Sequence, residues 1–132
     1  MSSQIISLSD NGPSVIFLPA NGIYYTAYNQ FLSCLFQKYS VSTVIYPPLL
    51  NNQLEVPNNL KWNLFSDIID ANFNADRNII GVGHSLGGTV LLYNALLHPD
   101  RFSHLFIIEP ALFHPLFCYF YSFLKFIGIA AA

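Results

Sequence analysis

A single serine between two glycines forms the pattern Gly83-x-Ser85-x-Gly87 near the middle of the chain. A β-branched run precedes the pattern and a helical pattern follows it, which is the context of a strand, a very sharp turn and a helix. In such a turn the serine takes a positive φ, and glycine fits two residues before and after it because the chain passes too close for side chains. The pattern therefore predicts that Ser85 is a nucleophile, placed at a helix N-terminus whose free N–H groups favour negative charge.

The same glycine-rich segment has other interpretations. A strand-to-helix turn of this kind can bind a phosphate group at the helix N-terminus, or bind nothing at all. A dinucleotide-binding loop would need Gly-x-Gly-x-x-Gly, but the segment that begins Gly81-Val82-Gly83 has Leu86 at the third glycine position. The nucleophile is the interpretation that the flanking strand and helix favour.

Composition limits the partners that the chain can have. With 132 residues it has the length of one domain, and 53% of its residues are hydrophobic whereas only 9% are charged. Five basic residues against seven acidic ones give a net charge of −2, so we expect no nucleic-acid partner. The first residues lack the charged and apolar regions of a secretory signal, which predicts a cytoplasmic protein. No histidine or cysteine spacing indicates a metal site, and we expect no cofactor.

The elements that must position the serine follow from hydrophobic periodicity. Strands are predicted at residues 4–8, 14–18, 41–46, 78–82 and 102–108, and helices at residues 27–39, 60–74 and 86–97. The turn signal at residues 9–13 predicts a hairpin between the first two strands. The alternation of strands and helices predicts an α/β fold, a mostly parallel sheet with helices on both faces. Its carboxyl edge would gather Asn21, Gly22, Ser85 and Glu109.

Over residues 14–112 the chain resembles the α/β-hydrolase family. The sequence Gly-His-Ser-Leu-Gly-Gly at residues 83–88 is close to the common form of that family. The loop at residues 19–22, Pro-Ala-Asn-Gly, is similar to the oxyanion loop of the family, with asparagine where histidine is frequent. Residues 97–102 resemble the family's run into the following strand, and residues 62–67 resemble a helix found in a subgroup with an Ala-Asn-Gly loop.

The resemblance implies a partial α/β-hydrolase fold and a serine hydrolase that cleaves ester or related acyl bonds through an acyl-enzyme. It implies Ser85 as the nucleophile, and the backbone N–H groups of Leu86 and Ile23 as donors to the oxyanion. Asn21 and Gly22 would lie beside the substrate. The aromatic-rich composition favours a small apolar acyl compound as that substrate.

The acid and the base of such a site have only weak local candidates. The family order is serine, acid, histidine, and the segments that carry the last two have no counterpart here. Glu109 and His114 follow Ser85 in the right order, whereas His84 precedes it and is expected to point away. We therefore expect a single domain, residues 1–132, that is truncated at its C-terminus and nearly inactive by itself.

An alternative function remains open from the sequence. In this alternative the chain is a non-catalytic remnant of a hydrolase that pairs with a partner or with itself through the bare sheet edge at residues 105–108.

The C-terminal segment has three interpretations. Residues 113–132 are nearly all apolar, and we expect them to begin a cap helix over the substrate pocket. Membrane contact by residues 115–132 is less favoured because Lys125 lies near the middle, and a damaged or artificial C-terminus is the third interpretation.

Overall fold

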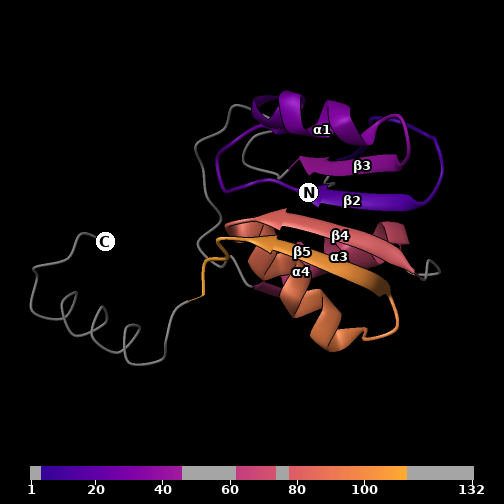
Figure 1. The fold of residues 1–132 in the computed structure, drawn as a ribbon. Helices are drawn as coiled ribbons and strands as arrows, with labels where there is room; N and C mark the ends of the chain where they lie inside the picture. Colours follow the sequence, from indigo (N-terminus) through magenta and orange to yellow (C-terminus); the bar gives the residue numbers. More distant parts are fainter. Residues whose placement is uncertain (1–3, 46–61, 74–77, 113–132) are drawn as a thin grey trace, which may run out of the picture.

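The structure is a computed structural model that describes residues 4–45, 62–73 and 78–112. A five-stranded sheet has the strand order β1-β3-β2-β4-β5 (Figure 1). The strands are β1 (Gln4–Ser7), β2 (Ser14–Leu18), β3 (Ser40–Ile45), β4 (Ile79–His84) and β5 (Phe102–Ile108). The helices are the short 3₁₀ helix η1 (Tyr25–Tyr28) and the α-helices α1 (Asn29–Leu35), α3 (Trp62–Phe73) and α4 (Leu86–Leu97).

The sheet is parallel except at one edge. Strands β2, β3, β4 and β5 run in the same direction, and only β1 is antiparallel to its neighbour, which is β3. The predicted α/β class is therefore confirmed, but the predicted hairpin between the first two strands is wrong. Both sides of β2 are already paired, with β3 and β4, so the outer side of β3 is the position that β1 takes. A turn signal specifies a reversal of the chain and not the strand that the reversed segment pairs with.

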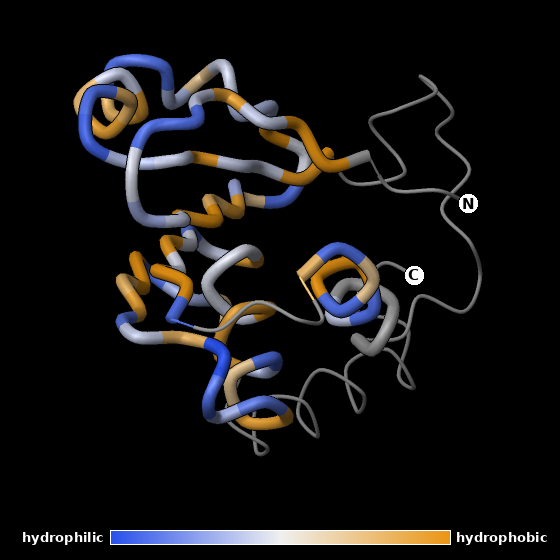
Figure 2. The backbone as a smooth tube through the Cα atoms, turned by 90° about the vertical axis from the view of Figure 1, so that its right-hand side faces the viewer, coloured by the Kyte–Doolittle hydropathy of each residue, from blue (hydrophilic) through white to orange (hydrophobic). Residues whose placement is uncertain are grey.

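Alternating side chains of β2 build two hydrophobic cores, one on each face of the sheet. Ile16 and Leu18 pack with residues of α3 and α4, whereas Val15 and Phe17 pack with Leu32 of α1. Figure 1 shows the same division, with α1 beside β2 and β3 and with α3 and α4 beside β4 and β5. Hydrophilic and hydrophobic residues alternate along the coils of the helices (Figure 2). A central strand buried on both faces explains the continuous apolar run of β2.

The first helix is shorter than its apolar periodicity predicts. The prediction was a helix over residues 27–39, but a 3₁₀ turn precedes α1, and α1 ends at Leu35. The backbone N–H groups of Lys38 and Tyr39 both donate to the Leu35 carbonyl, at 3.0 Å each. The next donor, the N–H of Ser40, bonds to Pro13 and begins β3. The apolar pattern therefore continues through a turn after Leu35 and stops where β3 begins at Ser40.

A polar cluster joins α3, α4 and the start of β5. Arg101 is only 1% exposed, and its Nη1 donates to Asp70 Oδ1 and to Asn94 Oδ1, the latter at 2.8 Å. The Asn94 side-chain amide in turn donates to Asp70 at 3.0 Å and to Ser66 at 2.8 Å. His98 Nε2 lies 3.2 Å from the same Asp70 oxygen. A buried guanidinium needs this carboxylate, because an unpaired charge in the interior is strongly destabilising.

The environment of Asp70 also makes the stability of the chain depend on pH. Burial by itself would raise the pKa of Asp70, but hydrogen bonds from Arg101 and Asn94 and the positive charge of Arg101 lower the pKa below its ordinary value of 3.8. The unfolded chain therefore binds a proton at this carboxyl at a higher pH than the folded chain does. The stabilisation is complete above about pH 4 and is lost as the pH falls through the folded-state pKa.

We expect Asp70→Ala to reduce the free energy of unfolding by about 3 kcal/mol at neutral pH, since Arg101 then remains buried without its carboxylate. Urea unfolding of the wild type and the variant from pH 7 to pH 3 measures the effect, and the difference between them should shrink below about pH 4. Asp67→Ala, an exposed aspartate on the same helix, is the matched control. A difference that is the same at pH 3 and at pH 7 would contradict the role assigned to the carboxylate.

Candidate active site

Ser85 lies at a sharp turn between β4 and α4. Its backbone has φ 51° and ψ −116°, which is an unfavourable conformation for a residue with a Cβ atom. The turn is held from both sides, because the Ser85 N–H donates to the Ile108 carbonyl at 2.9 Å and the Thr89 N–H donates to the Ser85 carbonyl at 3.1 Å. The predicted geometry of strand, strained serine and helix is confirmed.

Two glycines allow the backbone of this turn to pack closely. A Cβ atom added to Gly83 would lie 2.6 Å from the backbone nitrogen of Gly88. One added to Gly87 would lie 2.5 Å from the carbonyl carbon of Leu18 and closer still to its oxygen. All of these neighbours are backbone atoms that cannot move aside cheaply. The glycines are therefore required by close packing of the helix start against β4 and against the end of β2.

The loop after β2 begins directly beside the serine turn. Leu18 pairs with Gly83 in the sheet, so the residues that follow Leu18 leave the sheet next to the residues that lead to Ser85. The loop reverses at Gly22, which has φ 72°, and the Ile23 N–H donates to the Ala20 carbonyl at 3.2 Å. The donor predicted at Ile23 is thus engaged in a turn, and it would have to leave the Ala20 carbonyl to bind an oxyanion.

The first turn of α4 offers backbone donors at the same edge. Leu86 is the first residue of the helix, and N–H groups in a first helical turn have no acceptor within the helix. Together with the helix dipole, they make this edge favourable for negative charge. The Ser85 hydroxyl has no hydrogen-bond partner among the described residues, so no neighbouring base is seen to activate it.

The predicted acid and the histidines occupy different places. Glu109 follows Ile108, the partner of His84 in the sheet, so it lies at the same edge as Ser85; it is exposed and has φ 43°. The side chain of His84 bonds to the hydroxyl of Tyr28 at 2.8 Å. His114, the predicted base, lies outside the described residues, as does the apolar segment 113–132.

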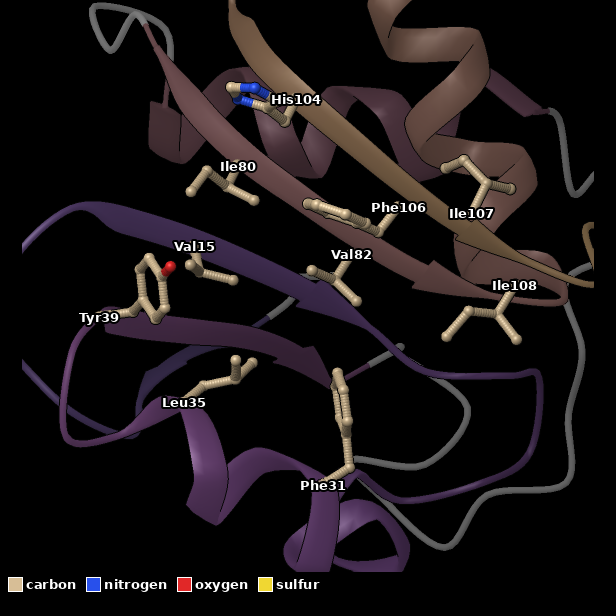
Figure 3. A pocket seen from close by; sticks show the side chains of 10 residues that line it. All are labelled: Val15, Phe31, Leu35, Tyr39, Ile80, Val82, His104, Phe106, Ile107 and Ile108. Carbon is tan, nitrogen blue, oxygen red and sulfur yellow. The ribbon is translucent and has the colours of Figure 1, made fainter.

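An apolar groove lies on the α1 face of the sheet. Its volume is about 580 Å³, and side chains of α1, β4 and β5 line it, among them Phe31, Ile80, Val82, Phe106 and Ile108 (Figure 3). Phe106 is 57% exposed, and Ile108 is 46% exposed. Of the residues that border this groove, Ile108 lies next to the serine turn, because its carbonyl accepts the Ser85 N–H at 2.9 Å. None of the predicted site residues Asn21, Gly22, Ile23, Ser85, Leu86 and Glu109 borders it.

Two groups of polar side chains were missed by the sequence interpretation. The Asp70–Arg101 cluster lies at the start of β5, whereas Ser85 follows the end of the parallel strand β4, so the cluster is at the opposite edge of the sheet. The second is Tyr28, whose hydroxyl bonds to His84 and to the Ala20 N–H. Tyr28 stands on an apolar stripe with phenylalanines and leucines, and its periodicity carries no sign of a polar contact.

Solved structures share this arrangement of strands and helices. A carboxylesterase structure from Nitrososphaera gargenis matches 96% of the chain with a TM-score of 0.74 at 11% identity. The carboxylesterase CesB (YbfK) from Bacillus subtilis matches 91% of the chain with a TM-score of 0.68 at 20% identity. The chain has the α/β-hydrolase fold. It covers 50% and 44% of those two structures, so it spans about half of their length.

The α/β-hydrolase fold by itself leaves the reaction open. The structural neighbours also include 1H-3-hydroxy-4-oxoquinoline 2,4-dioxygenase, which matches 93% of the chain and 48% of its own length with a TM-score of 0.71 at 16% identity. A family model described as "Putative esterase" matches residues 59–112, which contain the serine turn. No curated protein matches the sequence significantly. The reaction class therefore depends on the residues of the site.

Within the described ranges, no group of three or more histidine, cysteine, aspartate or glutamate side chains is placed to hold a metal ion. The helices of the same ranges are all too short or too polar to cross a membrane. Residues 115–132, the segment for which membrane contact was considered, lie outside those ranges.

We expect Gly87→Ala to reduce the free energy of unfolding by about 3 kcal/mol or more, because the new Cβ would overlap the Leu18 carbonyl group. Urea unfolding of the variant and the wild type is the measurement. Leu96→Ala on the exposed side of the same helix is the control, and it should change stability by less than about 0.5 kcal/mol. Equal stability of Gly87→Ala and the wild type would show that the turn tolerates a Cβ and is not closely packed.

Proposed function

We propose that the chain carries the nucleophile and oxyanion site of an α/β-hydrolase-fold serine hydrolase acting on ester or related acyl bonds. The observation that carries the proposal is the strained backbone of Ser85 at the start of α4. Strain of this kind is retained where the surrounding structure enforces it, and such positions cluster at active sites. The esterase family model over residues 59–112 and the carboxylesterases among the structural neighbours support the same reaction class.

In the proposed reaction, Ser85 Oγ attacks the carbonyl carbon of the substrate while its proton passes to a base. The carbonyl oxygen becomes an oxyanion, and the N–H of Leu86 stabilises it together with an N–H of the loop that holds Asn21, Gly22 and Ile23. Collapse of the tetrahedral intermediate expels the alcohol and leaves an acyl-enzyme, which water then hydrolyses. We propose a small substrate with an apolar acyl group, without a cofactor.

Removal of the proton from Ser85 Oγ is the step of the proposed reaction for which a base is needed. Among the histidines that the structure describes, His84 bonds to Tyr28, His98 contacts Asp70, and His104 borders the groove. None of them is bonded to the serine hydroxyl. A serine hydroxyl without a base is a weak nucleophile, so we propose that the 132 residues by themselves turn over substrate very slowly. Glu109 and His114 remain the proposed local acid and base.

A second candidate function is self-association, and β5 is the observation that favours it. This strand is at the end of the described sheet and pairs only with β4 in that sheet. Its groove side presents Phe106 and Ile108, both substantially exposed, on a face that α1 covers only in part. An unpaired edge with exposed apolar side chains is prone to pair with another copy.

The proposed nucleophile is tested with a fluorophosphonate probe, which forms a covalent bond with activated serines. We expect slow labelling at Ser85, detected by mass spectrometry of the digested protein and absent in Ser85→Ala. Ser103→Ala, which removes another serine hydroxyl from a strand of the same sheet, is the control and should label normally. Hydrolysis of p-nitrophenyl butyrate should not exceed the residual enhancement of about 10³–10⁴ over water that oxyanion binding alone supports. No labelling of a folded sample would overturn the proposal, and a fast Ser85-dependent rate would show that a base is present.

Self-association is tested by the molar mass in solution, measured by light scattering over a range of concentrations. We expect the wild-type chain to form dimers or larger species, and Phe106→Lys to shift it towards the monomer because a lysine on an edge strand opposes pairing. Leu96→Lys is the control, since Leu96 is 80% exposed on α4, away from the edge strand. A wild-type chain that stays monomeric at high concentration would contradict this candidate function.

A further inference from the structure

The hydroxyl of Tyr28 joins the two segments that build the proposed site. It lies 2.8 Å from His84 Nδ1, and the backbone N–H of Ala20 donates to it at 3.2 Å. His84 is the residue directly before Ser85, and Ala20 begins the loop that contains Asn21, Gly22 and Ile23. The two segments are far apart in the sequence, and a side chain of η1 connects them.

The hydroxyl of Tyr28 has the hydrogen-bonding groups for one continuous chain of contacts. A tyrosine hydroxyl has one hydrogen to donate, and its oxygen accepts. The oxygen already accepts from the Ala20 N–H, so a continuous chain forms when the hydroxyl hydrogen points to His84 Nδ1. In that arrangement His84 accepts at Nδ1 and carries its hydrogen on Nε2. A chain of this kind polarises each bond in the same direction, which strengthens both.

The aromatic ring of Tyr28 is held in place independently of its hydroxyl. Its centroid lies 4.9 Å from that of Phe17 and 5.8 Å from that of His84, both in edge-to-face geometry. Phe17 is 1% exposed at the centre of the core on this face. A tyrosine anchored in this way presents its hydroxyl at a defined point between the loop and the serine turn.

The two hydrogen bonds of the Tyr28 hydroxyl, to Ala20 and His84, form a bridge beyond the last ladder pair of β2 and β4. Ladder pairing between β2 and β4 ends at Leu18 and Gly83, so the chain beyond these residues has no ladder bond to fix the spacing of the two segments. The Tyr28 hydroxyl supplies a fixed link two residues further on, at Ala20. The Ala20 carbonyl in turn accepts the Ile23 N–H, so holding Ala20 also holds the turn of the loop that carries Asn21, Gly22 and Ile23.

We propose that Tyr28 is a positioning residue, which holds the loop of residues 20–23 against the turn at Ser85 through hydrogen bonds to Ala20 and His84. The inference deepens the proposed function, because an oxyanion site works only if its donors are held in place before the reaction. It also assigns a role to His84, which is to hold the hydroxyl of Tyr28 by a hydrogen bond at Nδ1 and not to activate the serine.

Tyr28→Phe tests the bridge, since it removes the hydroxyl and keeps the ring against Phe17. In the full chain labelled with ¹⁵N, the two ring nitrogens of His84 report which one carries the hydrogen. We expect the Nε2–H form in the wild type and a mixture in Tyr28→Phe. Amide hydrogen exchange of Ala20 and Ile23 should become about five- to tenfold faster in the variant. Tyr39→Phe, a half-buried tyrosine in the same hydrophobic core, should leave all three signals unchanged.

Labelling of Ser85 by the fluorophosphonate tests the consequence for the site. We expect Tyr28→Phe to label about 10- to 100-fold more slowly than the wild type. A displacement of a reacting group by about 1 Å or less causes a loss of rate of this size. Tyr39→Phe should label at the wild-type rate. Equal rates for Tyr28→Phe and the wild type, with both folded, would overturn the positioning role while leaving the proposed nucleophile intact.

The two measurements separate the two proposals. If wild-type Ser85 does not label at all, the proposed function fails, and the NMR signals of His84, Ala20 and Ile23 still decide whether Tyr28 holds the loop. Unchanged exchange of Ala20 and Ile23 in Tyr28→Phe would overturn the inference. If Tyr28→Phe does not fold, His84→Leu removes the other end of the bridge, and the same exchange measurement on Ala20 decides the result.

Discussion

The structure depends on one close approach of backbone to backbone, where the start of α4 packs against the ends of β4 and β2. Gly83 lies against the backbone of Gly87 and Gly88, and Gly87 lies against the Leu18 carbonyl group. No side chain fits into either contact. Because the helix begins so close to the strand, the single residue between them, Ser85, must reverse the chain in a strained conformation.

The same contact gives the edge its chemical properties. It places the first turn of α4, whose N–H groups have no acceptor within the helix, beside the start of the loop after β2. The helix dipole favours negative charge at this edge without any charged side chain. In the proposed site Ser85 is the nucleophile and backbone N–H groups are the donors, whereas no described residue is a base bonded to the serine hydroxyl. We therefore propose covalent capture of an acyl group rather than rapid turnover.

The two edges and two faces of the sheet have separate roles. The edge opposite Ser85 is held by the buried Arg101 and its carboxylate partner Asp70, which tie α3, α4 and β5 together. The face that carries α3 and α4 has a continuous apolar core. The other face is covered by α1 over part of its width, and Phe106 and Ile108 of β5 remain exposed there. The buried ion pair, the proposed chemistry and the proposed association are therefore located in different parts of the sheet.

The sequence alone determined the fold class and the serine turn, because both depend on local signals. Continuous apolar runs indicated the strands, and the spacing of Gly83, Ser85 and Gly87 indicated the turn that the structure contains. Helix α4 and strand β5 were predicted with their observed bounds, since each is delimited by residues close in the sequence.

Only the tertiary structure decided which segments meet. The pairing of β1 with β3, the bond from Tyr28 to His84 and the partner of the buried Arg101 all join residues that are far apart in the chain. An apolar stripe specifies that Tyr28 faces a core, but the partner of its hydroxyl depends on which loop and which strand end the sheet brings to that point. Periodicity describes the environment of a side chain, whereas a specific hydrogen bond also requires the position of its partner, which the packing of the sheet alone provides.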